Sequence, residues 1–182
     1  EGKDFSYSLP NGTYGKTAQD IQKDPKFSSF YIDHTREYIG CGKDVFNAAV
    51  EAVKTWRIFK SEWTMLCFDN LRLEIDTTFL ILARNGGFWS TNACRVVYVQ
   101  NEQLEDGDLV FAVGTGTLPL HVEQGEARYA VVLEQSTGRV YFEILSFSQP
   151  AHWTISLARP IGRYFQNAFS ASMVRVIKES VQ

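Results

Sequence analysis

A polar segment between residues 121 and 128 carries the residue types best suited to chemistry in this sequence. It reads HVEQGEAR, and His121 and Glu123 share one face if the chain is extended, because side chains alternate along a strand. An imidazole beside a carboxylate can act as a general base with its partner, or supply two ligands to a metal ion. A catalytic zinc ion needs three protein ligands, and the spacing matches no standard metal signature. We therefore expect no metal site.

Two interpretations of this segment remain open. In an enzyme of the hydrolase or cyclase type, His121 or His152 would be the base. Glu123 or Glu126 would then be the assisting carboxylate. In the structural interpretation, which we favour, the segment is a polar connection between strands.

The structural interpretation requires a partner for the carboxylate of Glu126, which we expect to be Arg128 or Arg95. Arg95 lies at the start of the apolar run CRVVYVQ. A buried guanidinium there would need a carboxylate or phosphate partner. An arginine at the end of a strand more often reaches water along its aliphatic stem, and we favour that alternative.

Two further polar segments suggest chemistry less strongly. Alternating glycine and threonine at 114–117 would let a ligand or another backbone approach closely, but the GK[ST] signature of a phosphate loop is missing. A bulged strand is the favoured interpretation. Ser148 and His152 resemble a nucleophile and its base, yet no G-x-S-x-G elbow accompanies them, so turn chemistry is favoured. We expect no cofactor.

Composition places the chain among ordinary globular proteins. Its 182 residues suffice for one domain with a core, and the net charge of −3 disfavours nucleic acid as a partner. Three cysteines without paired spacing indicate reduced thiols and an intracellular, cytoplasmic protein. No apolar stretch has the length of a transmembrane segment. The first residue is Glu1 rather than Met, so an organelle address stays open.

The pattern of apolar residues predicts an α+β fold. Apolar residues at spacings of three and four predict a helix at about 43–60, with Asp44 as its N-cap. Extended runs follow without helices between them, which indicates hairpins and an antiparallel sheet. The predicted strands are 31–39, 78–84, 94–100, 109–117, 128–135 and 139–147, the last two joined by the turn Ser136-Thr137-Gly138.

A second apolar stripe predicts a long C-terminal helix over about 155–181. Its aromatic half, from Tyr164 to Met173, must be covered, and the sheet is the surface available to cover it. We expect the sheet to wrap around this helix. Residues 1–30 carry turn signals and aromatic residues, and we interpret them as an arm on a single domain of residues 31–182.

The chain resembles the plant and bacterial family known as domain of unknown function number 1990 (DUF1990, UPF0548). The resemblance lies in YIGCG at 38–42, CRVVYV at 94–99, GTLPxHVExGEAR ending at Arg128, and the stretch 143–152. Ala93 and Gln149 depart from residues common in the family. The resemblance implies a fold similar to START and Bet v 1-like helix-grip proteins, which hold apolar molecules between a curved sheet and a C-terminal helix, and it implies no reaction.

These patterns lead to three functional hypotheses. The first is a small apolar or lipid-like ligand held between the sheet and the C-terminal helix. The second is the enzyme described above. The third is an interaction module without a small ligand, whose oligomeric state stays open. For the first, the expected ligand-binding residues are Arg95, His121, Glu123, Glu126, Arg128, Tyr141, His152, Phe165 and Phe169, with Met173 as a further apolar wall.

Overall fold

The computed structural model describes residues 5–68, 71–85, 88–119, 121–152 and 159–182, except the side chains of 85, 88 and 159–167. Within these ranges the centre of the fold is one antiparallel sheet of seven strands in the order β1-β7-β6-β5-β4-β3-β2. The strands are β1 (Tyr31–Cys41), β2 (Thr64–Leu66), β3 (Thr78–Asn85), β4 (Phe88–Gln103), β5 (Leu109–Thr117), β6 (Glu123–Leu133) and β7 (Arg139–Pro150). Strands β2 to β7 pair in chain order, as hairpins do, and β1 pairs with β7 at one edge.

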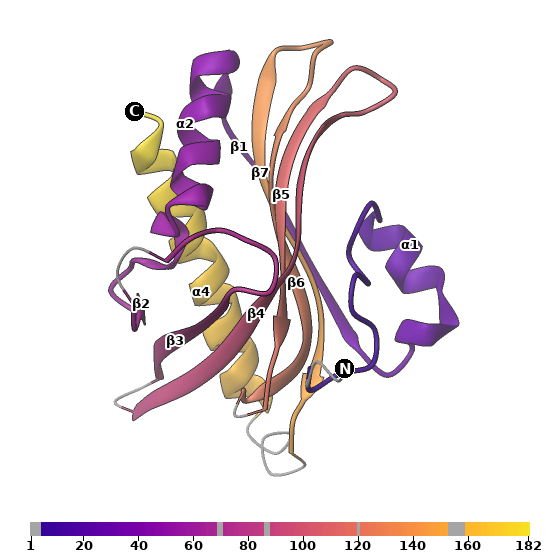
Figure 1. The fold of residues 1–182 in the computed structure, drawn as a ribbon, viewed down its shortest axis with the longest axis vertical. Coiled ribbons are helices and arrows are strands. Elements are labelled where there is room, and N and C mark those ends of the chain that lie inside the picture. The colour runs from indigo at the N-terminus through magenta and orange to yellow at the C-terminus, as the bar shows by residue number, and fades with distance from the viewer. Residues whose placement is uncertain (1–4, 69–70, 86–87, 120, 153–158) are drawn as a thin grey trace.

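Helices cover one face of the sheet and the N-terminal arm covers the other (Figure 1). On the inner face lie α2 (Lys43–Lys54), α4 (Arg159–Ser180) and the 3-10 helix η2 (Arg57–Phe59). The arm carries α1 (Ala18–Lys23) and the 3-10 helix η1 (Pro25–Phe27) against the outer face. None of the helices in the described ranges has the length and hydrophobicity that crossing a membrane requires.

The main core lies between the inner face and the helices. Phe59 of η2 is fully buried at its centre, and its ring packs against Phe79, Tyr129 and Phe169 at centroid distances of 5.2–6.2 Å. A second, smaller core lies between the outer face and the arm, where the rings of Tyr7, Phe27 and Phe30 surround Phe147. Because both faces are covered, the middle strands are apolar on both sides.

The predicted α+β architecture is confirmed, with local differences. Helix α2 ends at Lys54 instead of continuing to 60, because Trp56 adopts a left-handed backbone conformation (φ 59°) before η2 begins. The N-cap is Gly42, so Asp44 lies inside the first turn and not at the predicted cap position. The short edge strand β2 was not predicted, and β4 extends in both directions beyond the predicted 94–100.

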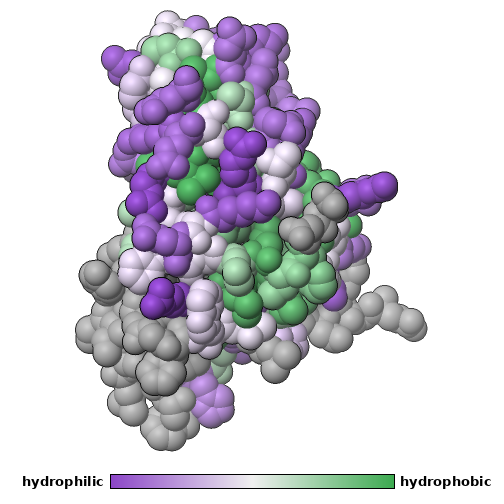
Figure 2. All heavy atoms as spheres, turned by 90° about the vertical axis from the view of Figure 1, so that its left-hand side faces the viewer, coloured by the Kyte–Doolittle hydropathy of each residue, from purple (hydrophilic) through white to green (hydrophobic). Residues whose placement is uncertain are grey.

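Seen from the side of the helices, polar residues cover the upper half of the molecule and an apolar area lies at mid-height (Figure 2). Large hydrophobic side chains on and beyond β2 are exposed, among them Met65, Phe68 and Ile75. Single exposed hydrophobic residues are common on protein surfaces, so these three do not by themselves define an interface.

Candidate functional site

A cavity of about 560 Å³ lies between the inner face of the sheet and α4. This volume is in the usual range of small-molecule sites. Phe169 and Met173 form its apolar wall on α4, and Ile81, Ala127 and Ile144 contribute from the strands. Close packing normally fills a protein interior, so an opening of this size in the core marks a candidate binding site.

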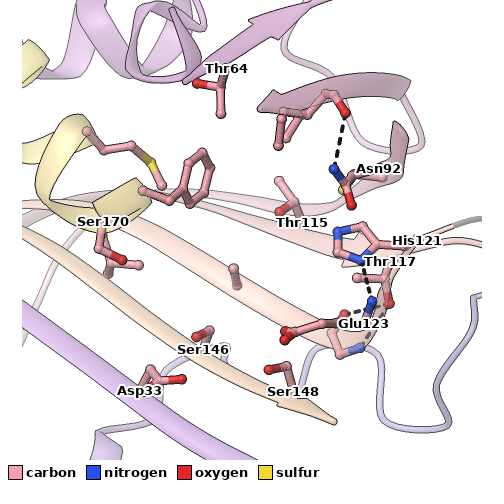
Figure 3. Close-up of a pocket in the computed structure, with 18 of the residues that line it drawn as sticks. Asp33, Thr64, Asn92, Thr115, Thr117, His121, Glu123, Ser146, Ser148 and Ser170 are labelled. Atoms are coloured by element: carbon pink, nitrogen blue, oxygen red, sulfur yellow. Dashed lines mark hydrogen bonds between the residues drawn. The ribbon is translucent and has the colours of Figure 1, made fainter. Parts of the chain in front are cut away.

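Hydroxyl groups line the sheet side of the cavity (Figure 3). Thr115 and Thr117 come from β5, and Ser146 and Ser148 come from β7. The members of each pair are two positions apart, which places both on the same face of their strand. The Thr117 hydroxyl is already hydrogen-bonded to the backbone of Gly125 and to Ser6 Oγ. The two serines of β7 therefore offer hydroxyl groups to a ligand whose other parts contact apolar side chains.

Asn92 of β4 brings an unpaired buried acceptor to the same cavity. Its Nδ2 donates to the carbonyl oxygens of Ile81 and Ser90 at 3.4 and 3.3 Å and contacts Ser90 Oγ at 3.1 Å. These acceptors fix the orientation of the amide. Among the described residues Asn92 Oδ1 then has no hydrogen-bond partner, although Asn92 is only 6% exposed. A buried polar atom without a partner costs free energy, and such atoms often mark functional sites.

His121 stands beside Asn92 at the cavity wall (Figure 3). Its Nδ1 accepts a hydrogen bond from the backbone N–H of Glu123 at 2.9 Å. Burial lowers the pKa of His121 to about 4. The ring is therefore neutral near pH 7, and with Nδ1 occupied as an acceptor its proton resides on Nε2. In this form Nε2 is a hydrogen-bond donor and not a base.

The low pKa of His121 makes stability depend on pH. The unfolded chain takes up a proton below about pH 6.5, whereas the folded chain resists protonation down to about pH 4. The free energy of unfolding should therefore fall by roughly 1–3 kcal/mol as the pH drops through this window. In His121→Asn the side chain still accepts a hydrogen bond from the N–H of residue 123. Because asparagine does not titrate, the decrease in the free energy of unfolding that is due to His121 should be absent in this variant.

Denaturant unfolding at pH 7 and pH 4.5 measures this effect. The exposed His152 provides the control, and His152→Asn should follow the wild type. Identical pH dependence in wild type and His121→Asn would contradict the assigned state of His121.

Several residues predicted from the sequence meet at the cavity. His121, Glu123, Phe169 and Met173 all line it. Glu126 borders it, but its carboxylate turns to the arm and accepts from Tyr7, Asn11 and Thr13.

The structure places other predicted residues away from the cavity. Arg95 donates to Thr78 Oγ1 at 3.2 Å and lies over the ring of Phe5, and Tyr141 packs beneath Arg36. These contacts lie on the outer face, and His152 is exposed beyond the end of β7. The side chain of Phe165 lies outside the described residues.

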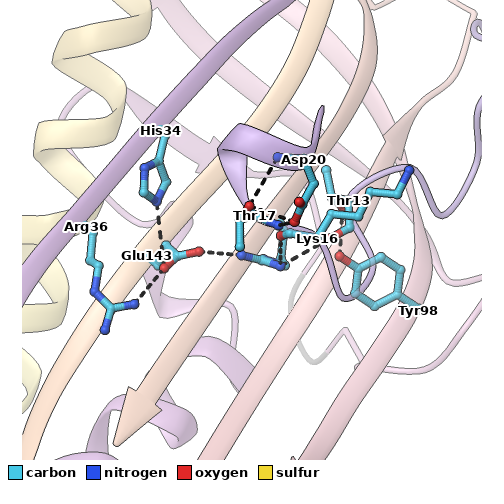
Figure 4. Close-up of polar contacts among 9 residues, drawn as sticks. Thr13, Lys16, Thr17, Asp20, His34, Arg36, Tyr98 and Glu143 are labelled. Atoms are coloured by element: carbon cyan, nitrogen blue, oxygen red, sulfur yellow. Dashed lines mark hydrogen bonds and ion pairs between the residues drawn. The ribbon is translucent and has the colours of Figure 1, made fainter. Parts of the chain in front are cut away.

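Glu143 lies beside the arm on the outer face (Figure 4), and Arg128 connects Glu143 to the arm. Arg128 Nη1 donates to the carbonyl oxygens of Thr13 and Lys16 at 3.2 and 2.9 Å, and its Nη2 pairs with Glu143. Burial raises the pKa of the Glu143 carboxyl, but Arg128 and Arg36 outweigh burial and hold the pKa below its ordinary value. The sequence-based pairing of Glu126 with Arg128 or Arg95 is wrong, because Arg128 pairs with Glu143 and the arm supplies the donors to Glu126.

Gly114 and Gly116 make room for aromatic side chains on the outer face of the sheet and not for a ligand. A Cβ added at Gly114 would collide with the ring of Tyr98, and one at Gly116 with Tyr7 and Phe5. The aromatic side chains that anchor the arm therefore require these glycines, while the intervening threonines face the cavity.

The described residues contain no cluster of three or more His, Cys, Asp or Glu side chains able to hold a metal ion. The described part of the chain also does not bring His121 and His152 to one cleft, since only His121 lines the cavity. The groups that do converge are hydrogen-bond donors and acceptors beside apolar walls.

A curved antiparallel sheet with a long C-terminal helix and a cavity between them defines a helix-grip protein. A protein of Thermus thermophilus, TTHA0849, shares this fold at a TM-score of 0.54 and 13% identity, covering 83% of this chain and 97% of that one. The di-domain ARO/CYC StfQ of the steffimycin biosynthetic pathway gives a TM-score of 0.54 at 12% identity, over 82% and 50%. Major latex-like protein 151 of Panax ginseng gives 0.50 at 12% identity, over 84% and 97%. At sequence identities this low, the comparisons show a shared fold and nothing about a shared function.

Sequence comparison gives the family. Residues 13–176 match the family described as "Domain of unknown function (DUF1990)". A UPF0548 protein of Dictyostelium discoideum is 37% identical over 172 residues, which cover 91% of this chain and 80% of the relative. The chain belongs to the DUF1990 family, as the resemblance at residues 38–153 predicted.

Proposed function

We propose that the protein binds a small, mainly apolar molecule in the cavity between the sheet and α4. The observation that supports this proposal is the cavity of about 560 Å³ between the inner face of the sheet and α4. Its walls combine apolar side chains from α4 with a few hydroxyl and amide groups from the strands. Pockets of this composition gain affinity from apolar contact and orient the ligand through few polar groups.

The enzyme hypothesis has weaker support. In the described residues His121 is neutral, and its Nδ1 lone pair is already used by the Glu123 N–H. A general base needs a free lone pair within reach of the substrate proton. The likeness to StfQ concerns the fold at 12% identity and brings no residue roles to this chain.

Filling the cavity tests the proposal. Ser146 faces the cavity from β7, and Ser146→Phe places a ring in the space that the ligand would occupy. We expect the wild type to bind the neutral fluorescent probe N-phenyl-1-naphthylamine. The variant should bind it at least about tenfold more weakly, which corresponds to about 1.4 kcal/mol.

The matched control is Ser136→Phe in the exposed turn between β6 and β7, which should bind like the wild type. Circular dichroism and thermal unfolding establish that each variant is folded. A wild type that does not bind the probe, or a folded Ser146→Phe variant that binds it with unchanged affinity, would contradict the proposal.

A further inference from the structure

Two polar groups at the cavity wall are complementary to a single chemical group. Asn92 Oδ1 is a buried acceptor that no described residue satisfies, and the Asn92 amide cannot turn round without losing the contacts of Nδ2 to Ile81 and Ser90. His121 presents Nε2–H as a donor, because the Glu123 N–H occupies Nδ1. Both residues line the cavity and lie next to each other in Figure 3.

We infer that Asn92 and His121 recognise a neutral hydroxyl group on an otherwise apolar ligand. A hydroxyl can donate to Asn92 Oδ1 and accept from His121 Nε2–H at the same time. An ether or a ketone only accepts, and an ammonium group only donates, so each leaves one member of the pair unsatisfied. A carboxylate would place negative charge against the carbonyl oxygen of Asn92. We therefore assign the ligand class as an alcohol or a phenol, in which one oxygen atom meets both requirements.

The surrounding wall agrees with this assignment. Thr115 and Thr117 stand close to His121 in the same part of the cavity, whereas Phe169 and Met173 form an apolar wall on α4. A ligand would thus place its hydroxyl group by β4 and β5 and its apolar body along the helix. The inference rests on the proposed function, since it names the ligand class of the same cavity.

Three naphthalene derivatives of similar shape test it. 2-Naphthol can donate and accept, 2-methoxynaphthalene can only accept, and 2-methylnaphthalene can do neither. Titration by intrinsic fluorescence gives the affinity of each probe for the wild type, Asn92→Leu and His121→Asn. For each protein we compare the affinity for 2-naphthol with that for 2-methylnaphthalene. This ratio corrects for changes in apolar binding that a substitution causes for both probes.

In both variants we expect this ratio to fall at least about tenfold relative to the wild type, as the loss of a buried hydrogen-bond partner predicts. His121→Asn keeps an acceptor for the N–H of residue 123 and removes the Nε2–H donor. This variant therefore tests hydroxyl recognition even if Asn92→Leu fails to fold. Asn101→Leu, on the same strand but outside the cavity lining, should keep the wild-type ratio.

The two possible failures are distinguishable. If all three probes bind and the ratio is unchanged in the variants, hydroxyl recognition is overturned while ligand binding stands. If no probe binds the wild type, the proposed function itself fails. A wild type that binds 2-methoxynaphthalene as tightly as 2-naphthol would also overturn the inference, because that ether cannot donate to Asn92.

Discussion

Replacing Glu126 by glutamine is expected to lower the free energy of unfolding by about 3–4 kcal/mol and to release the N-terminal arm. The Glu126 carboxylate is 2% exposed and accepts four hydrogen bonds. The donors are the Tyr7 hydroxyl at 2.7 Å, the Asn11 N–H at 2.9 Å, and the N–H and hydroxyl of Thr13 at 2.9 and 2.6 Å. Glutamine keeps the shape but turns an NH₂ group toward donors, so several buried polar groups lose their partner.

A graded series separates this effect from a general loss of packing. Tyr7→Phe removes one of the four hydrogen bonds and keeps the ring, so it should cost about 1–2 kcal/mol. Limited trypsin digestion reports the arm directly, since Lys16, Lys23 and Lys26 lie within it. Urea unfolding gives the stabilities. A Glu126→Gln protein with wild-type stability and an equally protected arm would refute the role assigned to Glu126.

The second large effect is expected for Phe59→Ala, which should cost about 3–5 kcal/mol. The Phe59 ring is completely buried and stacks on Phe169, with centroids 6.2 Å apart and an angle of 19° between the ring planes. Phe169 lines the ligand cavity, so removing the ring behind it opens a void next to that cavity. The variant should therefore accept longer apolar molecules than the wild type.

Two measurements check this prediction. Denaturant unfolding gives the loss of stability, with Phe68→Ala at an exposed position as the matched control, expected to stay within about 0.5 kcal/mol. Saturating toluene should raise the unfolding temperature of Phe59→Ala more than that of the wild type, because apolar voids in cores bind small hydrocarbons. An equal rise in both proteins would show that the void does not form beside the cavity.

The sequence was informative about the order of elements and much less so about the faces of the strands. The turn Ser136-Thr137-Gly138 and the extended runs predicted the hairpins correctly because turn chemistry and strand propensity are local. The end of α2 depends on the left-handed Trp56, which no helix signal in the sequence announces. Local patterns therefore predict elements better than their ends.

The sequence does not indicate which face of a strand each polar side chain occupies, for a specific physical reason. The inner and outer faces of β7 are both covered, so Phe142 and Ile144 face the helices while Leu145 and Phe147 face the arm. An apolar run on both faces does not reveal which polar neighbours point into a cavity. Arg95, Arg128 and Tyr141 are predicted as ligand-binding residues, whereas the structure places their side chains on the outer face of the sheet.

The missed cavity residues carried a signal that could have been used. Ser146 and Ser148 alternate with buried Phe147, and Thr115 and Thr117 alternate with glycines. Small hydroxyl residues with a period of two, at the same end of β5 and β7 on either side of β6, indicate a polar wall facing inward. Asn92 carried no such signal, because only the hydrogen bonds of its Nδ2 show that Oδ1 has no partner among the residues that the structure describes.

The segment from Gly114 to Arg128 is the most specific motif of the family, but it indicates no reaction. The reason is that its residues have two different structural roles. Its inward residues, such as Thr115 and His121, line the cavity. Its outward residues, such as Glu126 and Arg128, fasten the arm. Alternation along the strands thus joins a binding wall and a structural clamp in one segment.

Native mass spectrometry of the protein purified from its own host tests the central claim most directly. The wild type should carry a bound small molecule that organic solvent releases, while folded Ser146→Phe should be free of it and Ser136→Phe should retain it. Accurate mass and fragmentation of the released molecule should show a mainly hydrocarbon skeleton with a hydroxyl group. The same adduct on the wild type and on Ser146→Phe would place the molecule elsewhere and contradict ligand binding in the cavity.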